Sequence, residues 1–594
     1  MSDFLYSSKP QTTGSLAASL SRIYLNSSYE TAYHEFHGKW GSLAVTESCY
    51  HGFQPVETEN HICVVIGGPV LYFQDNDFIA RGDPQAGTHA ILNHWLAGKV
   101  DWSEDLSGPF IILLIDKKKR QVQCITDMMM FIPLYQHSNN DAVYLGTHID
   151  ALARACGEKE AFDEASMVDF ILHHLVTYPY TVYQNIRQCQ PGSIHYWSGD
   201  ENDTGILSKV ESYWQPLEFN PYDTLDEAAT YLRQGVQGYI DRVTGSLNNA
   251  AQFISAGEDS RVVAGMLPQW LERDAYIFLD NMNREGGLAE KIAKAYGARF
   301  KPDYRSQTHY LEILPEASNL VGSGHQYHHA HALGFDRMHN LRAYRAVFGG
   351  YISDSLLKAQ YAKKPRWVKK LPFLPQVSTK GETRTKRVSN RLFSSEVLGE
   401  ITRRRREHFS ELETIRPNSA HEWFELWPAT MRSTISSLHS NRRLFASYEV
   451  FMAKESVKMA ASVPASWKLN RRLFNLAFKP ALKKTQFVFH GDGRLPYYPW
   501  WVNSPLQFSA WLKKKLSKFA QSVGFEQKNQ GPWTDWRNIV NSPSWEEEIS
   551  RYKDKQLPTE LSDALEAGAL RGKELSISRK VNFLQVCYLS DSFK

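Results

Sequence analysis

The segment Ser255 to Ser260 (SAGEDS) has the residue types of a loop that binds phosphate. Gly257 lets the backbone approach phosphate oxygens without a Cβ in the way, and the hydroxyls of Ser255 and Ser260 can donate hydrogen bonds to them. Asp259 would be repelled by phosphate unless a cation lay between the two, so the segment predicts a Mg²⁺-bound phosphate ligand. The same residues also suit an ordinary strand-to-helix turn with Ser and Asp as caps. No GxxxxGK[ST] occurs, which excludes a Walker-type loop.

The elements around this segment decide between the two interpretations. Apolar and β-branched runs alternate with amphipathic segments from about residue 225 onward, which predicts a doubly wound parallel sheet. In such a sheet ligands bind outside the carboxyl ends of the strands, where the Ser255 turn lies. The predicted strands are Ala251–Ile254, Ala275–Leu279, Ala298–Tyr304 and Ala346–Phe348, and the predicted helices include Asp226–Val243 and the segment of Leu288, Ile292 and Ala295 that Gly297 ends.

Residues from about 40 to 200 favour short strands and a sandwich of sheets. The run His61–Phe73 is broken by a Gly-Gly-Pro turn, and Phe110–Ile115 with Val122–Ile125 predicts a hairpin. Asp163–Leu175 begins with acidic residues and carries an apolar stripe, so we expect a helix there. From His421 to the end the sequence favours helices with loop interruptions.

Four blocks carry a resemblance to the asparagine synthetase family, whose relatives include β-lactam synthetases and lasso-peptide cyclases. Phe253–Leu267 is similar to the pyrophosphate loop of that family, and Val347–Leu357 resembles its SGEGADELF stretch. Leu106–Tyr135 resembles its N-terminal LxGxFAFALWD region, and Tyr448–Pro464 resembles its C-terminal helical segment. The resemblance covers roughly residues 60 to 500.

The resemblance implies an α/β protein with a β-rich N-terminal domain. It implies a degenerate class II glutaminase-like αββα sandwich over residues 1–215 and a doubly wound PP-loop synthetase domain over 225–510. A helical C-terminal extension over 511–594 completes the expected organisation.

The resemblance also implies ATP-dependent amide (C–N) bond synthesis that forms AMP and pyrophosphate through an acyl-adenylate. ATP and Mg²⁺ are the implied cofactors, and a small-molecule or peptide carboxylate and an amine are the implied substrates. Tyr351, which stands where the family has the glutamate of SGEG, and Lys484, near the expected position of the family's lysine, are the candidate catalytic residues. The implied phosphate-binding residues are Ser255, Gly257, Asp259 and Ser260, and the implied metal ligands are Asp259 and Asp354.

The N-terminal half departs from the family at its nucleophile. The family uses a cysteine at the mature N-terminus, whereas this sequence begins Met-Ser-Asp and its first cysteine is Cys49. Without that thiolate we expect no glutamine hydrolysis, so the amine would be ammonia, part of a second substrate, or part of the same molecule. The alternative function is a catalytically degenerate scaffold or binding protein.

The composition narrows the class of partner. Lys and Arg exceed Asp and Glu by only 68 − 64 = 4. This net charge gives no indication of a nucleic-acid partner. The longest apolar run, Phe110–Ile115, is far shorter than the roughly 20 residues of a membrane span, and no secretory signal begins the sequence. The six scattered cysteines fit reduced thiols. We therefore expect a cytoplasmic protein without a membrane partner, with a homodimer as one possible state.

Three further clusters leave alternatives open. The histidines of HQYHHAH (His325–His331) suit a metal site, a substrate contact or a plain polar helix face. The run Arg403–Arg406 suits a solvated helix face or the docking of an acidic partner. The aromatic run Pro496–Trp501 suits a pocket wall or core packing.

Overall fold

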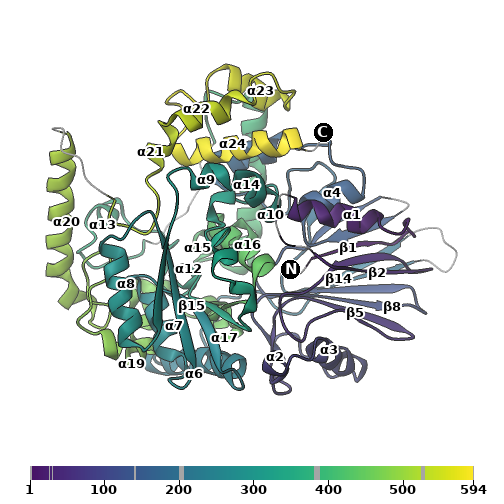
Figure 1. Cartoon of the computed structure of the whole chain (residues 1–594), viewed down its shortest axis with the longest axis horizontal. Coiled ribbons are helices and arrows are strands. Elements are labelled where there is room, and N and C mark those ends of the chain that lie inside the picture. The colour runs from purple at the N-terminus through teal and green to yellow at the C-terminus, as the bar shows by residue number, and fades with distance from the viewer. Residues whose placement is uncertain are drawn as a thin grey trace.

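The computed structural model describes residues 3–25, 27, 29, 31–139, 142–199, 206–379, 388–522 and 529–592. A domain of two antiparallel sheets lies beside a domain built on a parallel sheet, and C-terminal helices pack across both (Figure 1).

The N-terminal domain is a sandwich of two six-stranded antiparallel sheets. The first sheet runs, in spatial order, β12 (Ile186–Gln188), β10 (Tyr135–Ser138), β11 (Val143–Gly146), β1 (Phe4–Ser7), β3 (Gly41–Thr46) and β2 (Tyr33–Gly38). The second sheet runs β14 (Ile206–Ser212), β13 (Ser193–Gly199), β9 (Gln121–Thr126), β8 (Phe110–Asp116), β5 (His61–Gly67) and β4 (Val56–Glu57). A short pair, β6 (Val70–Leu71) and β7 (Leu106–Ser107), lies beside them.

The strand β8 shows why some strands of this domain consist of consecutive apolar residues. Ile111, Leu113 and Ile115 join the core between the two sheets. Ile112 and Leu114 point the other way, into a core shared with helices. Successive side chains in a strand point to opposite faces, so a strand covered on both faces must be apolar throughout.

Helices cover the outer faces of the sandwich. The helices α1 (Ser15–Ser21) and α4 (Ile149–Ala155) pack on the first sheet, and α3 (Ala86–Leu96) packs on the second. The helix α5 (Glu164–His173) follows in the chain, with Asp163 as its N-cap. The layers are thus helix, sheet, sheet and helix, and the predicted hairpin is the antiparallel pair β8 and β9.

The second domain is built on a parallel sheet of five strands. Their spatial order is β17 (Arg299–Tyr304), β16 (Glu272–Leu279), β15 (Asn249–Phe253), β18 (Val347–Gly349) and β19 (Ser447–Glu449). Every neighbouring pair is parallel. The prediction of a β-rich N-terminal region followed by a parallel sheet is confirmed.

Helices lie on both faces of this sheet. Ala275, Ile277 and Leu279 of β16 pack with α8 on one face, whereas Tyr276 and Phe278 of the same strand face a different core. The helices of the first face are α6 (Leu225–Thr244), α7 (Glu258–Met266), α8 (Arg284–Ala295), α17 (Lys454–Ser462) and α19 (Arg472–Leu482). The second face is covered by α10 (Leu314–Val321), α11 (Phe335–Met338) and α16 (Ser436–Leu444).

The C-terminal helices connect the two domains. The last helix, α24 (Ile577–Ser592), contacts α5 of the first domain and α10 of the second (Figure 1, top). The proposed boundary at 510 falls inside α20 (Trp500–Ser522). The other described α-helices are α2 (Phe78–Arg81), α9 (His309–Glu312), α12 (Ser353–Leu357), α13 (Arg366–Lys370), α14 (Ser395–Ile415), α15 (Ala420–Trp423), α18 (Ala465–Lys468), α21 (Trp536–Val540), α22 (Pro543–Ser550) and α23 (Thr559–Glu566).

A buried ion cluster joins the first strand of the N-terminal domain to α16. The Asp3 carboxylate lies 2.9 Å from Arg442 and 2.7 Å from Arg443, and all three side chains are almost fully buried. Burial opposes ionisation of Asp3, but the two guanidinium groups hold its pKa well below the usual range. The charged form of Asp3 therefore links the two domains.

Replacing Asp3 by Asn should lower the free energy of unfolding by about 3–5 kcal/mol, because two buried guanidinium groups lose their counter-charge. Urea unfolding measures this loss. The matched control is Glu290→Gln, which breaks an exposed pair with Lys294 and should change stability by less than about 0.5 kcal/mol. Equal, small effects of both variants would contradict the role given to Asp3.

Candidate active site

A cavity of about 2220 Å³ opens at the carboxyl ends of the parallel strands. The strands β15 and β18 lie next to each other in the centre of the sheet, and the segments that follow them line the cavity. The strand order reverses direction at this pair, as it does at the binding crevice of doubly wound sheets.

The loop after β15 is held in shape by its own serines. The backbone N–H of Ser255 donates to Ser260 Oγ at 3.0 Å, and the N–H of Gly257 donates to Ser255 Oγ at 3.1 Å. The N–H of Ala256 donates to the Glu285 carboxylate at 2.7 Å. The loop then enters α7, whose first-turn N–H groups have no partner within the helix and point toward its N-terminal end. This end of the helix favours a bound anion.

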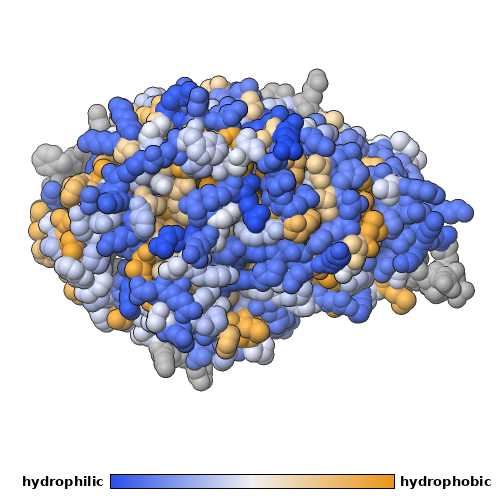
Figure 2. All heavy atoms as spheres, turned by 90° about the horizontal axis from the view of Figure 1, so that it is seen from below, coloured by the Kyte–Doolittle hydropathy of each residue, from blue (hydrophilic) through white to orange (hydrophobic). Residues whose placement is uncertain are grey.

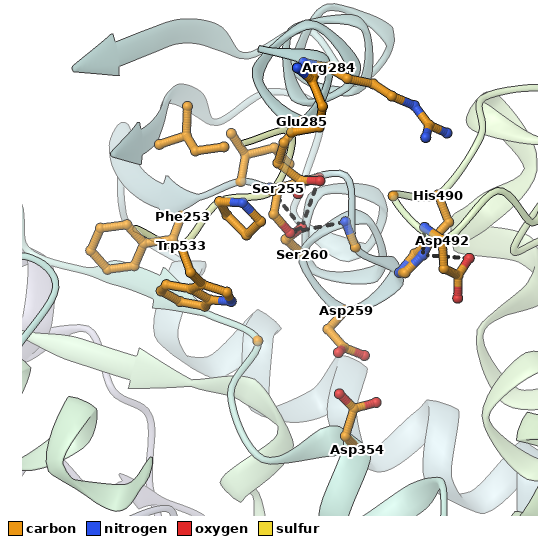
Figure 3. Close-up of a pocket in the computed structure, with 18 of the residues that line it drawn as sticks. Phe253, Ser255, Asp259, Ser260, Arg284, Glu285, Asp354, His490, Asp492 and Trp533 are labelled. Carbon is orange, nitrogen blue, oxygen red and sulfur yellow. Dashed lines mark hydrogen bonds and ion pairs between the residues drawn. The ribbon is translucent and has the colours of Figure 1, made fainter. Parts of the chain in front are cut away.

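Two carboxylates, each in the first turn of a helix, face one another across the cavity. Asp259 follows β15 and Asp354 follows β18, and their side chains point toward each other in Figure 3. The Lys358 ammonium lies between them, 2.9 Å from Asp354 and in direct contact with Asp259. Burial raises the pKa of Asp259 to about 6, with Lys358 opposing that rise. Burial also disfavours the ionised form of Asp354, but Lys358 holds its pKa below the usual range.

The Lys358 ammonium shows that this position suits a cation. Mg²⁺ is commonly held by one or two carboxylates together with substrate phosphates, which is the donor set that Asp259 and Asp354 can provide. In the described part of the chain, His, Cys, Asp and Glu form no group of three or more arranged to hold a metal ion. A metal here would therefore need oxygen ligands from the substrate.

A third carboxylate, Glu258, lies behind the loop and is only 2% exposed. It is 2.8 Å from Lys358 and 2.6 Å from both Arg471 and Arg494. Burial opposes its ionisation, but Arg494, Lys358 and Arg471 hold its pKa well below the usual range. Arg471 and its neighbour Asn470 adopt positive φ angles of 59° and 56°, a conformation that costs about 1 kcal/mol or more per residue. Glu258 thereby joins four chain segments around the cavity.

A fourth carboxylate, Glu449 at the end of β19, lines the cavity and is 4% exposed. Burial raises its pKa to about 7, and the backbone N–H of Tyr351 donates to it at 2.9 Å. A Cβ at position 349 would collide with the Glu449 carboxylate, so a larger residue than Gly349 would push that carboxylate out of its present position. The Tyr351 hydroxyl donates to Thr434, and the Arg432 guanidinium lies 4.6 Å from the centre of the Tyr351 ring.

The structure brings most of the predicted site residues together. One cavity is lined by Ser255, Gly257, Asp259, Ser260, Tyr351 and Asp354. Lys484 does not line it: this lysine is exposed on a short 3₁₀ turn, Lys483–Thr485. The roles assigned to the six residues remain predictions, and so does the role of Lys484, which the structure places outside the cavity.

The other clusters of the sequence also have definite positions. His329 and His331 line the cavity from the segment after α10. The His331 ring lies 4.4 Å from the Trp533 ring at an angle of 38°, and burial lowers the pKa of both histidines. His329 ends a one-turn 3₁₀ helix, Tyr327–His329, and His331 lies in the turn that follows it. Arg404 lies 2.7 Å from Asp163 and Arg405 lies 3.6 Å from Asp169, so two arginines of the basic run contact α5 and its N-cap in the first domain. Arg403 and Arg406 are exposed to solvent.

Four contributors to the site were not selected from the sequence: Glu258, Glu285, Lys358 and Glu449. Glu449 lies within the block Tyr448–Pro464 that carries part of the resemblance, so the sequence contained one indication that this residue belongs to the site. Lys358 follows Asp354 by four residues, which places both on one side of α12, but only the fold shows that Asp259 joins them.

The family's nucleophile is a cysteine at the N-terminus, and the cysteines of the first domain lie elsewhere in the chain. The expected N-terminal position, Met1, lies outside the described residues. Cys49 is buried after β3 and contacts the carbonyl of Arg443. Burial raises the pKa of Cys63 and Cys189, so neither is a ready thiolate at neutral pH.

Comparison with known proteins defines the class of the first domain. Residues 39–214 match the family model of a glutamine amidotransferase domain. The N-terminal domain is therefore glutamine amidotransferase-like, and at this coarse level it indicates an enzyme of amide-transfer chemistry.

Two solved structures stand beside this match. One is described as the allosteric regulatory enzyme of purine biosynthesis; it is 10% identical, and the match covers 50% of this chain and 80% of that chain at a TM-score of 0.21. The other is glutamine phosphoribosylpyrophosphate amidotransferase from B. subtilis with ADP and GMP, 9% identical over 53% of this chain and 92% of that chain, also at 0.21. Such low scores carry no argument about this chain. No curated protein matches it.

Replacing Glu449 by Gln should make the free energy of unfolding less sensitive to rising pH. The folded-state pKa of about 7 lies above the ordinary value of 4.5, so the folded state keeps a proton that the unfolded state releases. The free energy of unfolding of the wild type therefore falls between about pH 4.5 and 7 by about 3 kcal/mol from this group, and then levels off.

Urea unfolding at pH 5 and pH 8 measures the effect. The difference in stability between Glu449→Gln and wild type should shift in favour of the variant at the higher pH. Contributions from other buried acids cancel in that difference. A difference that is the same at both pH values would contradict the raised pKa.

Proposed function

We propose that this protein is an ATP-dependent amide-bond synthetase that forms AMP and pyrophosphate. The observation that carries the proposal is the convergence of Asp259 and Asp354 on one cation position beside the Ser255–Ser260 loop. A triphosphate needs this combination: backbone N–H groups and hydroxyls for its oxygens, and carboxylates for its metal ion. The glutamine amidotransferase-like first domain supports chemistry at an amide nitrogen.

The residues of the chain suggest how the first step would run. The β- and γ-phosphates would lie on the loop and the N-terminus of α7, with Ser255 and Ser260 donating to them. Asp259 and Asp354 would hold Mg²⁺, which neutralises charge on the departing pyrophosphate when it is bound. A substrate carboxylate oxygen would attack the α-phosphorus. The bond between the α-phosphorus and the oxygen that bridges it to the β-phosphate would break, giving an acyl-adenylate and pyrophosphate. Apolar groups beside the loop, including Ile254 and Phe278, offer a surface for the base.

Glu449 is the group best suited to the second step. The amine must lose a proton as it displaces AMP from the acyl carbon, and a carboxylate with a pKa near 7 can accept that proton at neutral pH. The backbone of Tyr351 orients Glu449, and Arg432 fixes the Tyr351 ring. In this proposal Glu449 takes the role of general base, and Tyr351 is a residue that positions it and lines the acyl site.

A second candidate function, a scaffold that has lost its chemistry, has specific observations in its favour. The Lys358 ammonium occupies the position between Asp259 and Asp354, and the Glu285 carboxylate already accepts the Ala256 N–H. A ligand would have to displace the first contact to bring a metal ion to both acids. Binding of the nucleotide therefore separates the two candidate functions.

Mg²⁺–ATP should raise the thermal unfolding temperature of the wild type, since a ligand at a hundred times its Kd stabilises the native state by about 2.7 kcal/mol. Asp259→Asn and Asp354→Asn should lose most of this response, because each removes one charge from the metal position. Lys484→Ala, an exposed lysine outside the cavity, is the matched control and should respond like the wild type. Thermal shift and calorimetry measure the response.

A stabilised wild type with both Asn variants unresponsive supports the synthetase, and the next assay is release of AMP and pyrophosphate with candidate carboxylates. No response of the wild type to Mg²⁺–ATP, with or without those carboxylates, contradicts the synthetase and favours the scaffold.

A further inference from the structure

The helix α20 carries an exposed row of large apolar side chains. Trp501, Phe508, Leu512 and Leu516 are 65%, 45%, 42% and 61% exposed. Their spacing of seven, four and four residues places them on one face of the helix. On an ordinary protein surface, exposed hydrophobic side chains are scattered singly. Four of them in one row on a single helix form a contiguous patch instead.

The opposite side of α20 borders the cavity, which Leu506 and Ala510 line. Phe373 packs against Trp511 and against part of Phe508, at ring distances of 5.5 and 5.1 Å, so Phe508 is the partly covered member of the row. Figure 1 shows α20 at the left edge of the molecule, outside the parallel-sheet domain. In Figure 2 hydrophobic residues gather at that same edge. The apolar row therefore faces outward from the protein.

The charge of α20 is entirely positive. Its 23 residues include no Asp or Glu, and the exposed Lys513, Lys514 and Lys515 lie within the same turns as Leu512 and Leu516. All three lysines also line the rim of the cavity, and helical geometry places Lys515 nearest to the apolar row and Lys514 farthest from it. A surface that complements this face must be apolar along the row and negative where it meets these lysines.

We propose that α20 binds an anionic membrane surface, with Trp501, Phe508, Leu512 and Leu516 in the interface and the lysines at the headgroups. A long helix with tryptophan, phenylalanine and leucine on one face and lysines beside them is typical of helices that lie in the plane of a membrane surface. Each lysine near an anionic leaflet adds attraction. At 1.5 Å per residue the helix is about 34 Å long, and its position at the edge of the molecule gives a flat surface access to the whole row.

This mode of binding differs from spanning a bilayer. No helix of the described chain is both long and apolar enough to cross a membrane. The expectation of no membrane partner rests on that criterion alone, whereas an interfacial helix needs only one apolar face. The helix also forms part of the wall of the cavity, but the proposal does not rest on the proposed nucleotide site, and its test needs no nucleotide.

Sedimentation of the full-length protein with lipid vesicles tests the proposal. Wild type should bind vesicles of phosphatidylcholine mixed with phosphatidylglycerol, and bind pure phosphatidylcholine more weakly, with high salt reducing the difference. The double variant Leu512→Glu, Leu516→Glu should bind the mixed vesicles at least about tenfold more weakly. The matched control is Leu207→Glu with Val210→Glu, which changes two exposed apolar residues of β14 and should bind like the wild type.

Circular dichroism and thermal unfolding establish that each variant is folded before the comparison. Wild type that stays in the supernatant with the mixed vesicles overturns the proposal, and so does a folded double variant that binds them as well as the wild type does. A wild type that ignores vesicles but forms a larger species in solution, lost in the double variant, would also overturn it and assign the row to a protein contact.

Discussion

The buried carboxylate of Glu258 is the interaction on which the arrangement of the site depends. Its partners come from three other places in the chain: Lys358 just after α12, Arg471 before α19, and Arg494 in the segment that leads to α20. A carboxylate buried to this degree requires compensating cations, and each cation in turn requires the carboxylate. The loop after β15, the segment after β18 and the walls of the cavity are therefore fixed relative to one another.

Lys358 connects this network to the proposed chemistry. The same ammonium group contacts Glu258, Asp259 and Asp354, so it balances three acids that would otherwise repel one another in a half-buried site. A metal ion that arrives with a nucleotide brings a larger charge to the same acids and would compete with Lys358 for them. Glu258 would then retain Lys358, since it lies deeper and does not line the cavity. The two buried ion clusters, around Glu258 and around Asp3, have different roles: the first arranges the site and the second joins the domains.

The sequence predicts those parts of the fold that depend on local pattern. Strand β15, the loop Ser255–Ser260 and helices α6 and α8 follow from apolar periodicity, capping residues and glycine, and the parallel order follows from strand–helix alternation. Glu449 and the contacts of Lys358 depend instead on which strands become neighbours, which periodicity does not reveal. Lys484 was selected by its distance along the chain, and the fold places that position on an exposed turn outside the cavity. The aromatic run Pro496–Trp501 leads into α20 and suits a core by composition, yet Trp501 is 65% exposed on the first turn of that helix.

The most direct test of the account is a crystal structure of the protein with Mg²⁺ and the α,β-methylene analogue of ATP, which cannot be cleaved at the adenylating position. The account predicts the β- and γ-phosphates on the Ser255–Ser260 loop, a metal ion bound to Asp259 and Asp354, and the Lys358 ammonium withdrawn from both acids while still paired with Glu258. A nucleotide bound elsewhere, or crystals in which Lys358 stays between the two aspartates at saturating nucleotide, would contradict it.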